Sequence, residues 1–214
     1  MTEADRWSWL RQAVHTPAID MDAYLDIPED LSKAIEVLDG LIVHCESPSP
    51  NHQAIQHNLV TVLGEAVDKQ DSEHRSCHKV RGDLDVLFSE VPFRFRRPDV
   101  TVYRCVLEGG RGKWGQKPWV SDVLLAVEVV SANTVSSDLS DKRAEYARAG
   151  IPHYWIVRMM HDDGPAVSVS RLRLDSFGDY VLIGASARGR DQLAIDAVDP
   201  FPIQVSWEAL DFRL

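Results

Sequence analysis

The sequence has 214 residues, 44% of them hydrophobic and 26% charged, which is typical of a globular protein large enough for one sizeable core. Its formal net charge of −10 argues against a general nucleic-acid binder, because such a protein would repel a phosphate backbone. No stretch approaches the roughly 20 apolar residues of a membrane-spanning helix, and the acidic N-terminus lacks the basic start of a signal peptide.

The N-terminal part predicts short helices and one hairpin. Residues 1–19 are expected to form a helical extension, and residues 20–214 a single domain. Asp20 is a candidate N-cap of a short helix. Apolar residues then alternate on both sides of Asp39 and Gly40, a dipeptide that suits a type I′ turn, so a β-hairpin is predicted there.

A longer helix is predicted next, with Ser49 as its cap and Pro50 at its first position. Three strand-like segments follow, at residues 74–80, 83–88 and 98–103. Residues 107–118 are rich in glycine and basic residues, which predicts a mobile loop.

The second half of the chain begins with a continuous apolar run at residues 122–130, as expected for a strand covered on both faces. Residues 136–150 predict a helix with a serine cap and Gly150 at its end. A buried strand, two antiparallel strands and a short helix are predicted at residues 153–157, 166–174, 180–187 and 206–212. This order of elements predicts an α/β or α+β fold, in which helices flank a mixed β-sheet.

Three cysteines, Cys45, Cys77 and Cys105, are widely spaced and odd in number. Such a set favours reduced thiols in a cytoplasmic protein over a disulfide framework. His74, Cys77 and His78 lie close together, but no second ligand pair follows at a suitable spacing, so a zinc site is disfavoured.

Two acidic residues interrupt strand patterns: Asp99 directly after Pro98, and Glu128 inside the apolar run. A buried carboxylate is costly unless it is paired or bound to a metal, and carboxylates on neighbouring strands suit Mg²⁺ or Mn²⁺. Two alternatives stay open: Asp99 could shape the turn after the proline, and Glu128 could pair with a core arginine. Asp85 is a weaker third candidate, for which a surface role is favoured.

Lys142 lies on the inward face of the helix predicted at residues 136–150, which Leu139 and Tyr146 mark by their spacing. The lysine could reach water along the surface, or pair with Asp138 one turn earlier. The functional interpretation is that Lys142 extends toward Glu128, where it would orient a water or stabilise a phosphoryl transition state.

The segments "RRPDV" and "VEVVSANT…DLSDKRAEYARAGIPHYWIV" resemble the Uma-type family of restriction endonucleases, within the PD-(D/E)XK nuclease-like superfamily. The resemblance extends upstream to "IEVLDGLIV" and "SPSPNHQAIQHNL" and covers residues 20–210. It implies a restriction-endonuclease-like core, with a mixed sheet flanked by helices, an additional N-terminal hairpin and C-terminal antiparallel strands. It also implies an endonuclease that uses Mg²⁺ or Mn²⁺ to hydrolyse phosphodiester bonds of nucleic acid, DNA rather than RNA.

The resemblance assigns Asp99 to the acid of the PD motif and Glu128 to the acid of the (D/E)XK motif, as metal-binding and catalytic residues. The motif lysine would fall at position 130, which is Val130 here, and Lys142 is the candidate for a catalytic replacement. The usual Ser-Pro-Ser-Thr after the acid reads "SANT" from Ser131, but the carboxylates and the lysine are intact.

Glu36 and His52 match upstream motifs of the family, so the resemblance places them near the site, and Asp138 is a third supporting residue. On pattern alone, Glu36 is typical of a solvated strand face. A histidine in a first helical turn, such as His52, is more often a surface or packing residue than a ligand.

Residues 94–117 contain seven basic and two acidic residues, a local charge of +5 (seven minus two). Together with Trp114 and Trp119, they could follow a phosphate backbone and stack on bases. The predicted nucleic-acid-binding residues are Arg96, Arg97, Lys113 and Lys117. The alternative is a charged sheet edge that prevents aggregation.

Three functions remain open on the sequence. The first is a metal-dependent endonuclease, which for double-strand cleavage with one site per chain would favour a homodimer. The second is a catalytically weak or inactive nucleic-acid- or partner-binding module that keeps the nuclease fold. The third is a structural or regulatory dimer in which the acids form a buried ion-pair network.

Overall fold

The computed structural model describes residues 18–45, 47–105, 112–131 and 136–211. The predicted N-terminal helical extension therefore lies almost entirely outside the described residues. The chain divides into two compact units: unit 1 (Met1–Ser47 and Asp85–Arg97) and unit 2 (Pro48–Leu84 and Pro98–Leu214). In the part of the chain that the structure describes, no helix is long and apolar enough to cross a membrane.

Unit 1 contains a four-stranded sheet in the order β2-β1-β5-β4. Its elements are α2 (Met21–Leu25), α3 (Glu29–Ser32), β1 (Ile35–Leu38), β2 (Leu41–His44), β4 (Val86–Glu90) and β5 (Phe93–Arg96). Asp39 and Gly40 take positive φ angles of 52° and 79° between β1 and β2, which confirms the predicted hairpin. Tyr24 packs its ring on Phe93 and Phe95, with ring centroids 5.5 and 4.7 Å away, and this aromatic cluster is buried.

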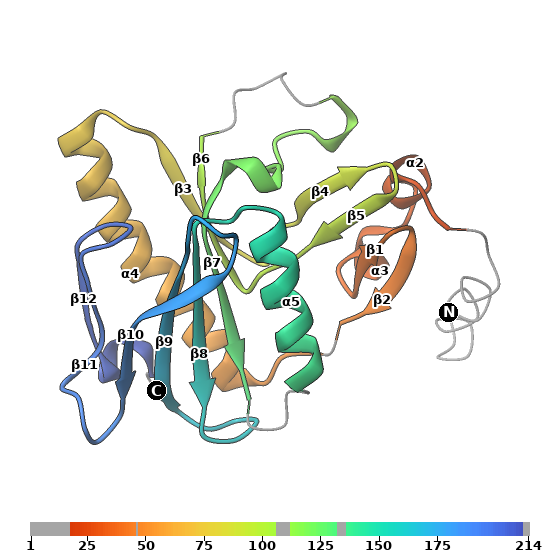
Figure 1. The fold of residues 1–214 in the computed structure, drawn as a ribbon. Coiled ribbons are helices and arrows are strands. Elements are labelled where there is room, and N and C mark those ends of the chain that lie inside the picture. The colour runs from red at the N-terminus through yellow and green to blue at the C-terminus, as the bar shows by residue number, and fades with distance from the viewer. Residues whose placement is uncertain (1–17, 46, 106–111, 132–135, 212–214) are drawn as a thin grey trace. The chain divides into compact units, whose positions relative to one another are not determined.

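Unit 2 is built on a six-stranded mixed sheet in the order β10-β9-β8-β7-β6-β3. Its strands are β3 (His78–Gly82), β6 (Val100–Arg104), β7 (Val123–Val130), β8 (His153–Met159), β9 (Ala166–Leu174) and β10 (Tyr180–Ala187). Only the β7–β8 pair is parallel among these described strands, and helix α5 (Ser136–Arg148) makes the crossover between them. The predicted mixed α/β fold with flanking helices is confirmed (Figure 1).

Helix α4 (Pro50–His74) begins as predicted, because Ser49 caps it by accepting a hydrogen bond from the backbone N–H of His52, and Pro50 is its first residue. Its apolar stripe, which includes Leu59 and Leu63, is buried in one core with Val127 of β7. Helix α5 packs on the opposite face of the sheet, where Tyr146 meets Tyr154 edge to face. The two helices thus cover both faces of β7, as its continuous apolar sequence indicates.

The remaining elements complete unit 2. A separate two-stranded sheet pairs β11 with β12, and its apolar residues join the same core as α4. These elements are β11 (Leu193–Ala197), β12 (Ile203–Ser206), α6 (Trp207–Leu210), and two 3₁₀ turns, η1 (Gly112–Trp114) and η2 (Val120–Asp122).

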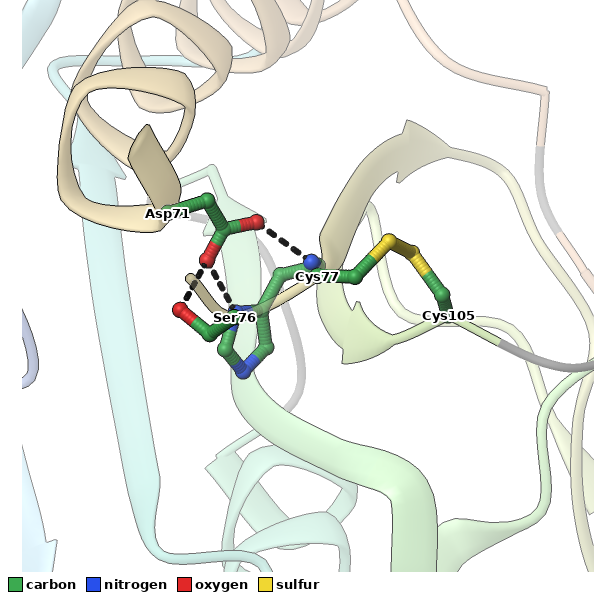
Figure 2. Close-up of a disulfide and its surroundings, with 5 residues drawn as sticks. Asp71, Ser76, Cys77 and Cys105 are labelled. Carbon is green, nitrogen blue, oxygen red and sulfur yellow. Dashed lines mark hydrogen bonds and ion pairs between the residues drawn. A yellow bond between two sulfur atoms is a disulfide. The ribbon is translucent and has the colours of Figure 1, made fainter. Parts of the chain in front are cut away.

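A disulfide joins Cys77 to Cys105, with a Cα–Cα distance of 5.4 Å (Figure 2). The prediction of reduced thiols is therefore wrong for these two residues. The cysteines consequently no longer support a cytoplasmic location. The reason is the register of β3 and β6, which pairs His78 with Arg104 and so brings together the cysteines just beyond the ladder. Cys45 takes no part in this disulfide and is half-buried.

Beside the disulfide, Asp71 of α4 accepts hydrogen bonds from the Ser76 hydroxyl at 2.6 Å and from the His78 backbone N–H at 2.5 Å (Figure 2). Its carboxylate also lies 2.7 Å from Nδ1 of His78. These donors lower the pKa of Asp71 against the opposing effect of burial. His78 thus serves to fasten the end of α4 to β3, and no zinc-type cluster occurs there among the described residues.

Candidate active site

The Asp99 carboxylate lies against the backbone of strand β7. Val100 pairs with Val127, so Asp99, one residue earlier, lies beside the position of Glu128 on the neighbouring antiparallel strand. Its Oδ2 accepts a hydrogen bond of 2.6 Å from the backbone N–H of Val129. Asp99 and Glu128 therefore lie at the same end of the β6–β7 ladder, as the motif assignment requires.

The backbone of Asp99 is fixed as firmly as its side chain. Its carbonyl oxygen accepts hydrogen bonds from Nε2 of Gln56 at 2.8 Å and from the backbone N–H of Asp83 at 3.3 Å. Gln56 is buried and lies one turn after His52 on α4. Gln56 was not among the predicted residues, although its position at i+4 from His52 on a core-facing helix could have indicated it.

Glu128 is a buried carboxylate, only 4% exposed, with a donor on each oxygen. Lys142 places its ammonium 3.0 Å from Oε2, and the hydroxyl of Tyr146 donates to Oε1 at 2.7 Å. The predicted contact between Lys142 and Glu128 is thus present, and among the described residues no arginine is seen to take its place. The part played by Tyr146 was missed, since its spacing marked it only as a core residue.

Burial raises the pKa of Glu128 to about 7. Lys142 opposes this effect by favouring the ionised form, whereas the charge of Asp99 adds to it. The influence of Asp99 on the pKa agrees with the backbone geometry, because two carboxylates affect each other in this way only at close range. The Lys142 ammonium therefore lies where the carboxylates of Asp99 and Glu128 are close to each other.

His52 lies within reach of both Asp99 and strand β7. Its Nε2 is 2.9 Å from the carbonyl oxygen of Val129 and 3.5 Å from Oδ2 of Asp99. Burial lowers the pKa of His52, but the hydrogen bond and charge of Asp99, together with the Val129 carbonyl and the charge of Asp83, outweigh burial, so the pKa lies above its ordinary value. Unit 2 thus brings together four of the predicted residues: Asp99, Glu128, Lys142 and His52.

Glu36 is held by contacts within unit 1. It lies in β1 of unit 1, where its carboxylate accepts hydrogen bonds from Nη1 of Arg96 at 2.7 Å and from the backbone N–H of Arg97 at 2.8 Å. Glu36 is 4% exposed, so the interpretation as a solvated strand face is wrong. Its partner in space, Arg96, was not evident because β5 was not predicted as a strand.

Arg96 and Arg97 direct their charges into unit 1. Arg96 is 3% exposed and paired with Glu36, while Arg97 binds Asp85 through Nε at 2.7 Å. Asp85 also accepts a hydrogen bond of 2.9 Å from Tyr24 and is buried, which corrects its predicted surface role. In this arrangement both guanidinium groups are paired with carboxylates of unit 1, and their role in nucleic-acid binding stays a prediction.

The rest of the predicted basic surface is partly described. Lys113 is exposed, whereas Lys117 places its ammonium over the ring of Trp114, 4.7 Å from the centroid. Trp114 is 2% exposed, so its ring is not accessible for stacking on bases. The described residues do not include residues 106–111, the "ANT" part of the altered family motif or the side chain of Asp138.

The oxygen donors near Asp99 fit a divalent metal by their chemistry. Two carboxylates, from Asp99 and Glu128, and the carbonyl of Val129 are hard ligands of the kind that Mg²⁺ and Mn²⁺ prefer, with waters completing the shell. Within the described ranges, no group of three or more His, Cys, Asp or Glu side chains is arranged to hold a metal. The fit therefore rests on two side chains and a backbone oxygen.

Comparisons with known proteins agree with the fold described above. The chain resembles a crystal structure described as "a putative nuclease belonging to DUF820" from Anabaena variabilis ATCC 29413, with a TM-score of 0.59 and 18% sequence identity. The match covers 90% of this chain and 97% of the other, and at this identity it shows a shared fold. No curated protein matches the sequence. The family model for Uma2, described as "Putative restriction endonuclease", matches residues 21–202, and the chain therefore belongs to the Uma2 family.

Proposed function

We propose that the protein is a metal-dependent endonuclease that hydrolyses phosphodiester bonds of nucleic acid, with DNA as the preferred substrate. The observation that carries the proposal is the meeting of Asp99, Glu128 and Lys142 at one end of the β6–β7 ladder in a chain of a nuclease family. Three residues distant in sequence, two acids and a lysine, are the groups that such hydrolysis requires.

Asp99, Glu128 and the carbonyl of Val129 would hold Mg²⁺ or Mn²⁺. When bound, the ion supplies an acidified water and neutralises charge on the phosphoryl oxygens. Lys142 contributes a fixed positive charge beside Glu128, where it orients the carboxylate and stabilises negative charge as it develops on the phosphate. Lys142 comes from α5 and not from β7. It would take the role that the motif lysine has at position 130, where this chain has Val130.

The test is a cleavage assay on plasmid and single-stranded DNA and on RNA, with Mg²⁺ or Mn²⁺. Wild type is compared with Asp99→Asn and Glu128→Gln, which keep the side-chain size, and with Glu65→Gln, an exposed acid of α4, as control. We expect cleavage by wild type and the control, and none by the two site variants. Cleavage that persists in both site variants would contradict the proposal.

A second function is favoured by one observation: both oxygens of Glu128 already accept hydrogen bonds from the chain. A carboxylate held in this way suits a binding module that keeps the nuclease fold without efficient catalysis. This alternative predicts that the protein binds nucleic acid and leaves it intact under every metal condition.

For the endonuclease, a two-fold dimer is proposed for duplex substrates, since each chain offers one such site.

A further inference from the structure

Nε2 of His52 lies between two oxygens that the proposed metal site needs. It is 2.9 Å from the carbonyl oxygen of Val129 and 3.5 Å from Oδ2 of Asp99. These two oxygens belong to the same small region, because Oδ2 of Asp99 also accepts the backbone N–H of Val129. One imidazole nitrogen thus faces a carbonyl and a carboxylate at once.

The chemistry of the Val129 carbonyl determines the state of His52. A carbonyl oxygen only accepts hydrogen bonds, so Nε2 must carry the hydrogen in this contact. A nitrogen that carries hydrogen has no lone pair for a metal. His52 in this arrangement is therefore a donor to the two oxygens and not a metal ligand.

The other ring nitrogen does not anchor the imidazole. Nδ1 of His52 is buried and has no hydrogen-bond partner among the described residues. Most buried polar atoms in proteins do have a partner, so an orphan atom of this kind needs an explanation, and a second position of the ring provides one. Rotation of the ring would release Nε2 from the two oxygens and change the surroundings of Nδ1.

We propose that His52 is a placeholder for the metal: its Nε2–H holds the Val129 carbonyl and the Asp99 carboxylate together until a divalent cation replaces it. This inference rests on the proposed metal site. Metal–oxygen distances of roughly 2.0–2.2 Å leave no room for an N–H donor on the same lone pairs. Where the cation takes the lone pairs that accept Nε2–H, the ring turns away and its hydrogen bond is lost.

The test measures metal affinity without any cleavage. Binding of Mn²⁺ is followed by calorimetry for wild type, for His52→Phe, which keeps a planar ring but loses the donor, and for His57→Phe. His57 is an exposed histidine of the same helix, so this control carries the same change outside the site. We expect His52→Phe to bind Mn²⁺ about tenfold more tightly than wild type, because a charge-assisted hydrogen bond no longer competes.

An unchanged dissociation constant in His52→Phe would overturn the placeholder, since the ring would then not compete with the cation. Weaker binding would overturn it as well and would make His52 a support or a ligand. If His52→Phe does not fold, wild-type protein labelled with ¹⁵N-histidine gives the answer. We expect Mg²⁺ to shift the Nε2–H signal of His52 and to leave His57 unchanged, and a His52 signal that does not move would contradict the proposal.

Failure of this inference and failure of the proposed function give different results. A protein that binds Mn²⁺ with the expected competition but never cleaves nucleic acid keeps the placeholder and loses the nuclease activity. A protein that cleaves with Mg²⁺, and whose His52 variant binds Mn²⁺ like wild type, keeps the activity and loses the placeholder.

Discussion

The hydroxyl of Tyr146 donates a 2.7 Å hydrogen bond to Oε1 of Glu128, from helix α5 to strand β7. Both side chains are buried, Tyr146 completely. A buried carboxylate oxygen that lost this donor would be left without a partner. The tyrosine therefore limits the directions in which Glu128 can point, a constraint that any metal-binding role of the carboxylate would use.

Replacing Tyr146 by Phe tests this positioning role. We expect kcat for cleavage to fall about 10- to 100-fold, with KM little changed, because a hydrogen bond to a charged group contributes about 1.5–3 kcal/mol. Tyr180→Phe is the control, since that buried hydroxyl donates to the backbone carbonyl of Ile151. We expect the control to lower Tm without lowering kcat. Equal losses of kcat in the two variants would assign the effect to stability.

Replacing Lys142 by Met tests the lysine from the helix. We expect single-turnover cleavage to slow by about 10²- to 10³-fold, as when one group that stabilises transition-state charge is removed. Lys142→Arg should recover part of the rate. Lys69→Met, at an exposed position of α4, is the control. Wild-type rates for a folded Lys142→Met protein would remove the lysine from the mechanism.

Replacing Glu36 by Gln separates a structural from a catalytic role. The variant leaves Arg96 buried without its charged partner, so the free energy of unfolding should fall by about 3–5 kcal/mol in denaturant titrations. Glu29→Gln, which removes an exposed pair with Lys33, should leave the unfolding curve unchanged. Full stability together with lost cleavage in Glu36→Gln would instead place Glu36 in the chemistry.

His153 gives a pH dependence of stability. Burial lowers its pKa, Asp199 opposes this effect, and Arg173 adds to it. A histidine whose pKa is lower in the folded than in the unfolded state stabilises the fold above its unfolded pKa of about 6.5. That contribution is lost as the pH falls from 6.5 through the folded pKa.

We therefore expect the free energy of unfolding to decrease below about pH 6.5 in wild type, and to decrease less in His153→Gln. Denaturant titrations at several pH values between neutral and mildly acidic measure the slope. His57→Gln, an exposed histidine, serves as control. Parallel slopes for wild type and His153→Gln would show that other groups cause the acid effect.

The disulfide between Cys77 and Cys105 should stabilise unit 2. Its sequence separation is 28, and Cys77→Ser should lower the free energy of unfolding by about 2–4 kcal/mol. Adding a reductant to wild type should give the same loss, and Cys45→Ser should give none. A wild-type protein whose stability is unaffected by reductant would show that the bond does not form in solution.

Local rules predicted much of the fold. The Asp39–Gly40 turn, the cap at Ser49 and the buried strand around Glu128 each depend on a few neighbouring residues, and each is present as predicted. Strand β5 was missed because its alternating aromatic and basic residues were interpreted as part of a charged surface. The disulfide was missed because it depends on the β3–β6 register, which no local pattern reveals.

The contacts of the candidate site also divide into those that local spacing predicts and those that it does not. Lys142 could be connected with Glu128 because helical spacing showed which face of α5 turns inward. The contacts of Gln56 with Asp99, and of Arg96 with Glu36, join segments more than 40 residues apart. Only the assembled fold brings such pairs together, so the pairing of Arg96 with Glu36 could not be inferred from the sequence.

Residue 99 is fixed from three sides, by Gln56, by Asp83 and by the N–H of Val129. Folding alone therefore settles the orientation of its carboxylate, and no further conformational entropy is lost there when a ligand arrives. A variant that loosens residue 99 without touching its carboxylate, such as Gln56→Leu, would then weaken metal binding through entropy. Calorimetry would show this as a less favourable binding entropy with little change in enthalpy.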